Sequence, residues 1–112
     1  MKVQSEQTNK GLAIDAQSIT RWGISAFKKA GVPEGDARTI VEALVKTSLG
    51  GIDSHGIARI THYLQRFQKG TINKTPQPDF IRTAAATGEL HGDDGHGIVL
   101  MRQASAHAIE MA

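Results

Sequence analysis

The chain has 112 residues, of which 39% are hydrophobic and 21% are charged, and its formal net charge is +2 at pH 7. This length suits one compact domain or a piece of one, and is too short for a cofactor domain beside a substrate domain. The small net charge gives no support to nucleic-acid binding. Because the sequence contains no cysteine, disulfides, thiolate zinc sites and a cysteine nucleophile are excluded.

The first segment, residues 1–12, is polar and lacks the apolar stretch of a signal peptide or membrane anchor, so we expect a mobile tail. No apolar run approaches the roughly 20 residues that a bilayer-spanning helix needs. We therefore expect no membrane partner, and the absence of cysteine leads us to expect a cytoplasmic protein.

The next two elements are expected to be helices. Asp15 is a suitable N-cap, and apolar residues then recur at helical spacing until Gly31 and Pro33 end the run. A second helix is expected to start at residues 33–36 and to end at the glycine pair 50–51.

A third helix is expected from Asp53 or Ser54, either of which can cap it, to about Lys69, with Gly70 following as its terminator. At helical spacing, one face of this segment is apolar and the opposite face is cationic. The apolar face comprises Ile57, Ile60, Leu64 and Phe67, and the cationic face comprises His55, Arg59, His62 and Arg66.

Two short strands, 80–83 and 89–91, are expected after the prolines at positions 76 and 78, joined by a turn at Thr87-Gly88. A glycine-rich turn over residues 92–97 then leads into a fourth helix from about Ile98, with no closing signal before Ala112. The predicted segment is mainly α: three helices, a short β-ribbon and the start of a fourth helix. The chain looks cut rather than finished.

The cationic face of the third helix is either a solvated polar surface or a site for an anionic substrate. At a helix start, free N–H groups and the helix dipole attract anions and disfavour a charged imidazolium at His55. A neutral histidine can pass a proton near pH 7, and Arg59, one turn later, offers a planar fork for a carboxylate. Tyr63 lies one further turn along and either donates its hydroxyl to a ligand or packs its ring at the core edge.

Other candidate sites are weaker. His55 and His62 lie roughly 10 Å apart along a helix, too far to share one metal ion. His91 and His96 lack a third ligand, so no metal site is expected. The glycines of residues 92–97 match neither GxGxxG nor a P-loop and predict a plain turn. A helix-turn-helix DNA reader is disfavoured, because the third helix starts without a cluster of lysines and arginines.

The segment Gly51–Arg59, with the sequence GIDSHGIAR, resembles the malate/L-lactate dehydrogenases that are unrelated to Rossmann-fold lactate dehydrogenases. Residues 43–45, Tyr63, Gly70 and residues 90–97, with the sequence LHGDDGHG, extend the resemblance over nearly all of 15–112. It implies the N-terminal portion of an oxidoreductase, usually a homodimer. Such an enzyme transfers hydride between NAD or NADP and C2 of a 2-hydroxy or 2-oxo acid such as malate or lactate.

The resemblance also implies roles for single residues. His55 corresponds to the histidine that donates or accepts the proton, and Arg59 to the arginine that holds the substrate carboxylate. Ser54 and Tyr63 are expected to join Arg59 in binding the substrate. The family usually carries a small or hydrophobic residue where His96 stands, so His96 receives no role.

By the same resemblance, the chain is expected to open a larger, non-Rossmann α/β dehydrogenase fold. Residues 13–75 would form a helical subdomain carrying the SHGxxR motif, and 76–112 would begin a truncated catalytic and cofactor domain. Most cofactor-binding residues are expected beyond residue 112, so the 112 residues alone should be inactive and would need the missing C-terminal portion as a partner. The alternative is a truncated, non-catalytic helical module that binds a partner through an exposed apolar surface.

Overall fold

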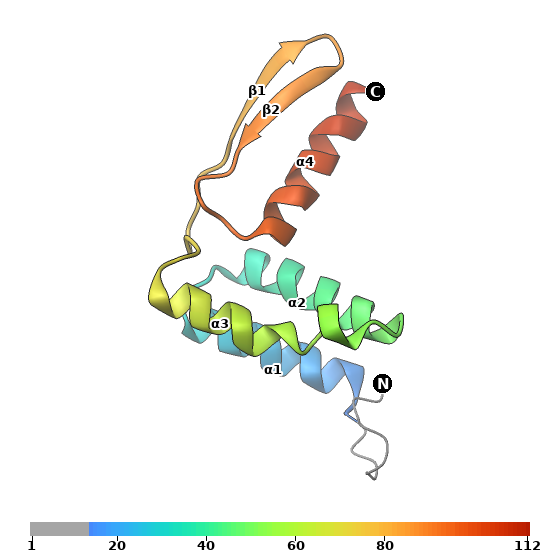
Figure 1. Ribbon diagram of the computed structural model, residues 1–112, viewed down its shortest axis with the longest axis vertical. Helices are drawn as coiled ribbons and strands as arrows, with labels where there is room; N and C mark the ends of the chain where they lie inside the picture. The colour runs from blue at the N-terminus through green and yellow to red at the C-terminus, as the bar shows by residue number, and fades with distance from the viewer. Residues whose placement is uncertain (1–13) are drawn as a thin grey trace.

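Three helices at one end and a hairpin with a fourth helix at the other make up the computed structural model, which describes residues 14–112 (Figure 1). The tail predicted for residues 1–12 lies outside them. The elements are α1 (Ala16–Lys29), α2 (Glu34–Leu49), a 3₁₀ turn η1 (Asp53–His55), α3 (Arg59–Lys69), β1 (Asp79–Ala84), β2 (Thr87–His91) and α4 (Gly97–Met111). None of the helices in the described part of the chain has the length and apolar character to cross a membrane.

The three-helix end is held by an aliphatic core with two aromatic rings. Asp15 caps α1 as predicted, because its Oδ2 accepts the Ser18 N–H at 3.1 Å. Phe27 of α1 meets Phe67 of α3 edge to face, with ring centroids 5.7 Å apart. The largest fully buried side chains are Phe27, Phe67, Ile40, Ile60 and Val41.

The predicted start of the third helix is wrong. Neither Asp53 nor Ser54 caps α3, which begins at Arg59, and the backbone of Gly56 (φ −108°, ψ −133°) separates it from η1. Gly56 packs directly on Ser48 of α2: a Cβ on Gly56 would lie 2.1 Å from Ser48 Oγ. The Ile57 N–H donates to the same Oγ at 2.9 Å. Attachment to α2 therefore replaces a continuous helix, and His55 does not occupy the first turn of α3.

The end of α3 and the two-stranded ribbon agree with the predictions, but the predicted position of the hairpin turn is wrong. Gly70 follows α3 with φ 82°, a left-handed conformation that ends helices and favours glycine. Thr87 and Gly88 begin β2, and the turn lies at residues 85–86. Gly88 packs closely on Phe80 within the ribbon, because a Cβ there would lie 2.4 Å from Phe80 Cζ.

Strands β1 and β2 pair antiparallel, with Phe80 opposite Leu90. Phe80 also stacks on His107 of α4, with ring centroids 3.9 Å apart. This contact joins the hairpin to α4, and Figure 1 shows the two running side by side.

Candidate functional site

The Ser54-His55 turn stands on the surface just ahead of α3. Both residues are exposed, and Ser54 Oγ lies 2.9 Å from His55 Nδ1, within hydrogen-bond distance. No other hydrogen bond engages the His55 ring within residues 14–112. The hydroxyl thus orients the imidazole through Nδ1 and leaves Nε2 as the ring atom that can exchange a proton with a ligand.

Arg59 is the first residue of α3 and is half-buried. None of the ion pairs among the described residues involves its guanidinium. Tyr63 follows one turn later, about 6 Å along the helix axis. The predicted cationic face is confirmed for α3 itself, where His62 and Arg66 are exposed while Ile60 and Phe67 are buried.

Tyr63 is half-buried and packs its ring against His96, at the start of α4. The two ring centroids lie 4.3 Å apart and the rings are nearly perpendicular, at 85°. Tyr63 and Arg66 also line a hollow of about 480 Å³, together with Thr71, Ile72 and residues 94–98. Of the two environments considered for Tyr63, ring packing is therefore present, and the ring also borders a cavity.

His96 is the residue that sequence reasoning left without a role. It is only 5% exposed, and its Nδ1 caps α4 by accepting the Ile98 N–H at 3.1 Å. Burial first, and the nearby positive charge of Arg66 second, lower the pKa of His96 to about 4. His96 is therefore a neutral, structural histidine at physiological pH. Its position between a turn and an apolar helical run was the available signal for an N-cap.

The turn that carries His96 is tightly held and does not fit a phosphate group. Asp93 and Asp94 adopt left-handed conformations, with φ 55° and 58°, and Asn73 fixes both through hydrogen bonds to their carbonyls at 3.0 and 2.8 Å. A Cβ on Gly95 would lie 2.8 Å from Pro76 Cγ, so a glycine here lets the turn pack closely on Pro76. The carboxylates of Asp93 and Asp94 in this turn would repel a pyrophosphate. One N–H at the start of α4, that of Ile98, already donates its hydrogen bond to His96 Nδ1. A nicotinamide dinucleotide thus finds no cradle at this turn.

The remaining histidines have structural surroundings of their own. His91 Nε2 lies 3.2 Å from Glu89 Oε1 on the exposed hairpin, His107 stacks on Phe80, and His62 is exposed on α3. Within residues 14–112, no three histidine, aspartate or glutamate side chains gather as a metal site requires.

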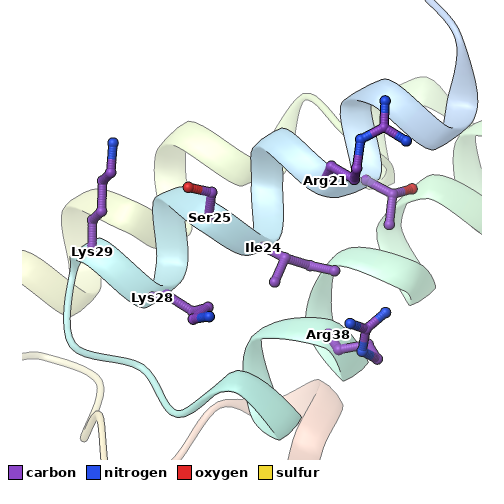
Figure 2. Close-up of a pocket in the computed structure, with 7 residues that line it drawn as sticks. Arg21, Ile24, Ser25, Lys28, Lys29 and Arg38 are labelled. Atoms are coloured by element: carbon purple, nitrogen blue, oxygen red, sulfur yellow. The ribbon is translucent and has the colours of Figure 1, made fainter.

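A cationic groove between α1 and α2 was not anticipated from the sequence. Its volume is about 460 Å³, and Figure 2 shows the basic side chains around it. They are Arg21, Lys28, Lys29 and Arg38.

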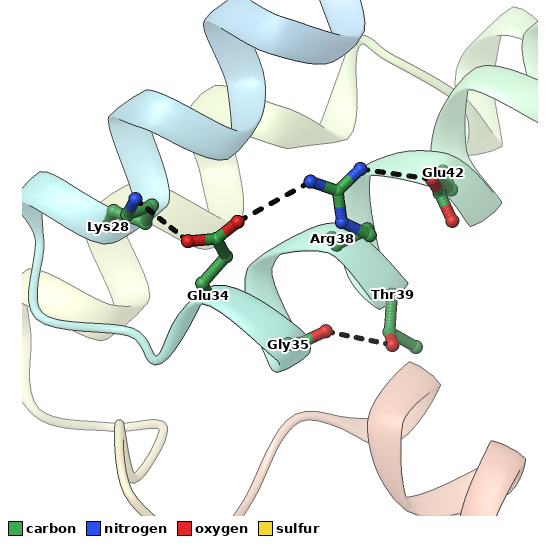
Figure 3. Close-up of polar contacts among 6 residues, drawn as sticks. All are labelled: Lys28, Glu34, Gly35, Arg38, Thr39 and Glu42. Carbon is green, nitrogen blue, oxygen red and sulfur yellow. Dashed lines mark hydrogen bonds and ion pairs between the residues drawn. The ribbon is translucent and has the colours of Figure 1, made fainter.

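Carboxylates of α2 neutralise part of this groove, as Figure 3 shows. Glu34 lies 3.0 Å from Lys28 Nζ and 3.5 Å from Arg38, which also pairs with Glu42 at 3.5 Å. The hydrogen bond and charge of Lys28, followed by Arg38, hold the pKa of Glu34 below its usual range. The Lys28–Glu34 pair ties α1 to α2, and the two Arg38 pairs lie within α2. Because these pairs engage two of the basic side chains, the groove is not assigned to ligand binding.

The fold and the Ser54–Arg59 segment agree with one family of dehydrogenases. Residues 14–112 match the family model described as malate/L-lactate dehydrogenase. The chain therefore belongs to the malate/L-lactate dehydrogenase family, whose members are oxidoreductases.

Individual proteins similar to this chain agree with the family model. The chain is 37% identical to the L-sulfolactate dehydrogenase of Methanocaldococcus jannaschii over 89 residues, 80% of this chain and 26% of that protein. It is 36% identical to the malate dehydrogenase of Pyrococcus abyssi, over 80% of this chain and 25% of that protein. The structure of malate dehydrogenase from Pyrococcus horikoshii superposes on 88% of this chain and 28% of its own, with a TM-score of 0.85 and 29% identity. The chain thus spans about a quarter of the length of these relatives.

Proposed function

We propose that this chain supplies the acid-binding and proton-transferring part of a dehydrogenase for 2-hydroxy acids, such as malate or lactate. His55 exchanges the proton, Arg59 holds the substrate carboxylate, and Ser54 and Tyr63 complete the site. One observation carries the proposal: an exposed histidine, oriented by a neighbouring hydroxyl at 2.9 Å, stands four positions before an arginine that has no ion-pair partner among the described residues. Membership in a dehydrogenase family supports the interpretation of these residues as a site for an acid substrate.

The chemistry follows from the residue types. When a 2-hydroxy acid is oxidised, the hydroxyl proton leaves to a base as the C2 hydrogen departs with its electron pair, giving a 2-oxo acid. His55 Nε2 is the ring atom free to take that proton. The planar guanidinium of Arg59 binds a carboxylate through two parallel hydrogen bonds and orients C2. A nicotinamide coenzyme, NAD or NADP, supplies the hydride acceptor when bound.

We also propose how the chain is divided around this site and how the protein assembles. We place residues 13–75 in a helical subdomain with the SHGxxR motif, and residues 76–112 in the beginning of a catalytic and cofactor domain. A cytoplasmic homodimer is the assembly we propose.

A second function, a non-catalytic interaction module, is favoured by apolar side chains exposed on α4. Met101 is 67% exposed and Ile109 is 76% exposed, and exposed apolar groups in one region are typical of contact surfaces. The two functions differ in turnover. A module would bind a protein partner without oxidising any acid, whereas a dehydrogenase reduces its coenzyme when supplied with the right acid.

The test is an assay of the full-length protein with malate, lactate and sulfolactate, each with NAD and with NADP. The absorbance of the reduced nicotinamide measures turnover. We expect turnover with at least one acid. Arg59→Lys keeps the charge but loses the bidentate fork, so it should raise KM for the acid. No turnover with any 2-hydroxy acid would favour the interaction module, and an unaltered KM would remove Arg59 from the carboxylate site.

A further inference from the structure

The ring of Tyr63 is held by a residue on another element. Its only close partner from outside α3 in the ring contacts of the described residues is His96, at 4.3 Å and 85°. His96 in turn lies nearly parallel to Phe67, with centroids 5.9 Å apart and an angle of 19°. The imidazole therefore sits between a core phenyl ring and the tyrosine that borders the cavity.

The orientation of the His96 ring is itself fixed. Because Nδ1 accepts the Ile98 N–H, the neutral ring carries its proton on Nε2. Nε2 is fully buried and has no hydrogen-bond partner among the described residues. The ring therefore keeps its place through the cap at one nitrogen and through packing, and not through a second hydrogen bond.

We propose that His96 is the positioning residue for Tyr63: its ring, anchored to the N-terminus of α4, holds the tyrosine ring in place beside the hollow that both residues line. This inference rests on the proposed function for the role of Tyr63, but the ring contact itself does not depend on it. Since Tyr63 and His96 come from α3 and α4, the contact also couples the helical end of the chain to the segment that begins at the glycine-rich turn.

Two substitutions separate the two contributions of His96. Asparagine is a good N-cap and retains an acceptor for the Ile98 N–H, but it has no ring. Phenylalanine keeps a ring against Tyr63 but cannot accept the hydrogen bond. His91→Asn is the matched control, because the His91 side chain is exposed on the hairpin.

The direct measurement is the NMR signal of Tyr63 in the full-length protein carrying isotope-labelled tyrosine, with Tyr63→Phe identifying the signal. We expect His96→Asn to move it to the position of a free tyrosine, whereas His96→Phe and His91→Asn leave it near its wild-type position. An unchanged signal in His96→Asn would overturn the proposal. If His96→Asn does not fold, His96→Phe decides: a Tyr63 signal that keeps its wild-type position supports the proposal, and one that moves to the free-tyrosine position overturns it.

Kinetics supply a second readout. Because a tyrosine hydroxyl binds ground state and transition state alike, His96→Asn should raise KM by up to about tenfold, the scale of one neutral hydrogen bond, and leave kcat nearly unchanged. A fall in kcat at constant KM would contradict the positioning role. If the wild-type protein oxidises no 2-hydroxy acid, the proposed function fails, while the Tyr63 signal still decides whether His96 holds the ring.

Discussion

Gly56→Ala tests how the His55 turn is attached to the helical core. The new Cβ would lie 2.1 Å from Ser48 Oγ and 2.9 Å from Ser48 N, far inside van der Waals contact. Rotating the Ser48 side chain away would break its hydrogen bond from the Ile57 N–H. Overpacking costs about 1–3 kcal/mol, and a lost hydrogen bond adds about 1 kcal/mol. We therefore expect Gly56→Ala to lower the free energy of unfolding by about 2–4 kcal/mol.

Urea denaturation of the full-length protein, followed by circular dichroism, measures this change. Gly35→Ala is the matched control: Gly35 lies in the first turn of α2, and a Cβ added there would meet no atom within 4 Å. That substitution should stabilise the protein by up to about 1 kcal/mol. In a Ser48→Gly background, Gly56→Ala should cost at least about 1 kcal/mol less, as a double-mutant cycle reports. A loss below about 0.5 kcal/mol for Gly56→Ala alone would refute the described contact.

Two further predictions concern stability. Because the pKa of His96 is lowered from 6.5 to about 4 in the folded state, the unfolded chain binds its proton first as the pH falls. The neutral His96 ring therefore makes its full contribution to the free energy of unfolding above pH 6.5, and this contribution is lost as the pH falls from 6.5 to about 4. Its size is about 3 kcal/mol. His96→Asn should remove this part of the loss of stability at acid pH. Urea titrations at pH 6.5 and at about pH 4 measure the loss in each protein. An equal fall in the free energy of unfolding for His96→Asn and the wild type would contradict this prediction. Gly70→Ala should cost about 1–2 kcal/mol, because Gly70 has φ 82° and nothing lies within 4 Å of the added Cβ. A thermal midpoint equal to that of the wild type would show that the left-handed conformation is not required.

Local sequence signals predicted the elements well. The Asp15 cap, the Gly70 terminator and the pairing of the two strands each depend on residues close to one another in sequence. The hairpin turn was predicted at Thr87-Gly88 but lies two residues earlier, at residues 85–86. Spacing also separated the buried and exposed faces of α3, since a helix repeats every 3.6 residues.

Long-range contacts account for what the sequence did not predict. Asp53 and Ser54 are good capping residues, yet the contact between Gly56 and Ser48 ends the turn before a helix can form. His96 touches Tyr63, which is 33 positions earlier in the chain, and this separation leaves no local pattern. The prediction of a proton-transfer role for His55 depends on the family resemblance, and the structure adds that His55 is exposed and lies 2.9 Å from the Ser54 hydroxyl.

The most direct test of the central proposal is the turnover number of His55→Ala in the full-length protein, at saturating acid and coenzyme. Loss of a general acid or base lowers kcat by about 10²-fold or more, so we predict that reduction for His55→Ala. His91→Ala, in which an exposed histidine is replaced far along the chain, should turn over at the wild-type rate. Equal kcat values for His55→Ala and the wild type would contradict the assignment of His55 as the proton-transferring residue.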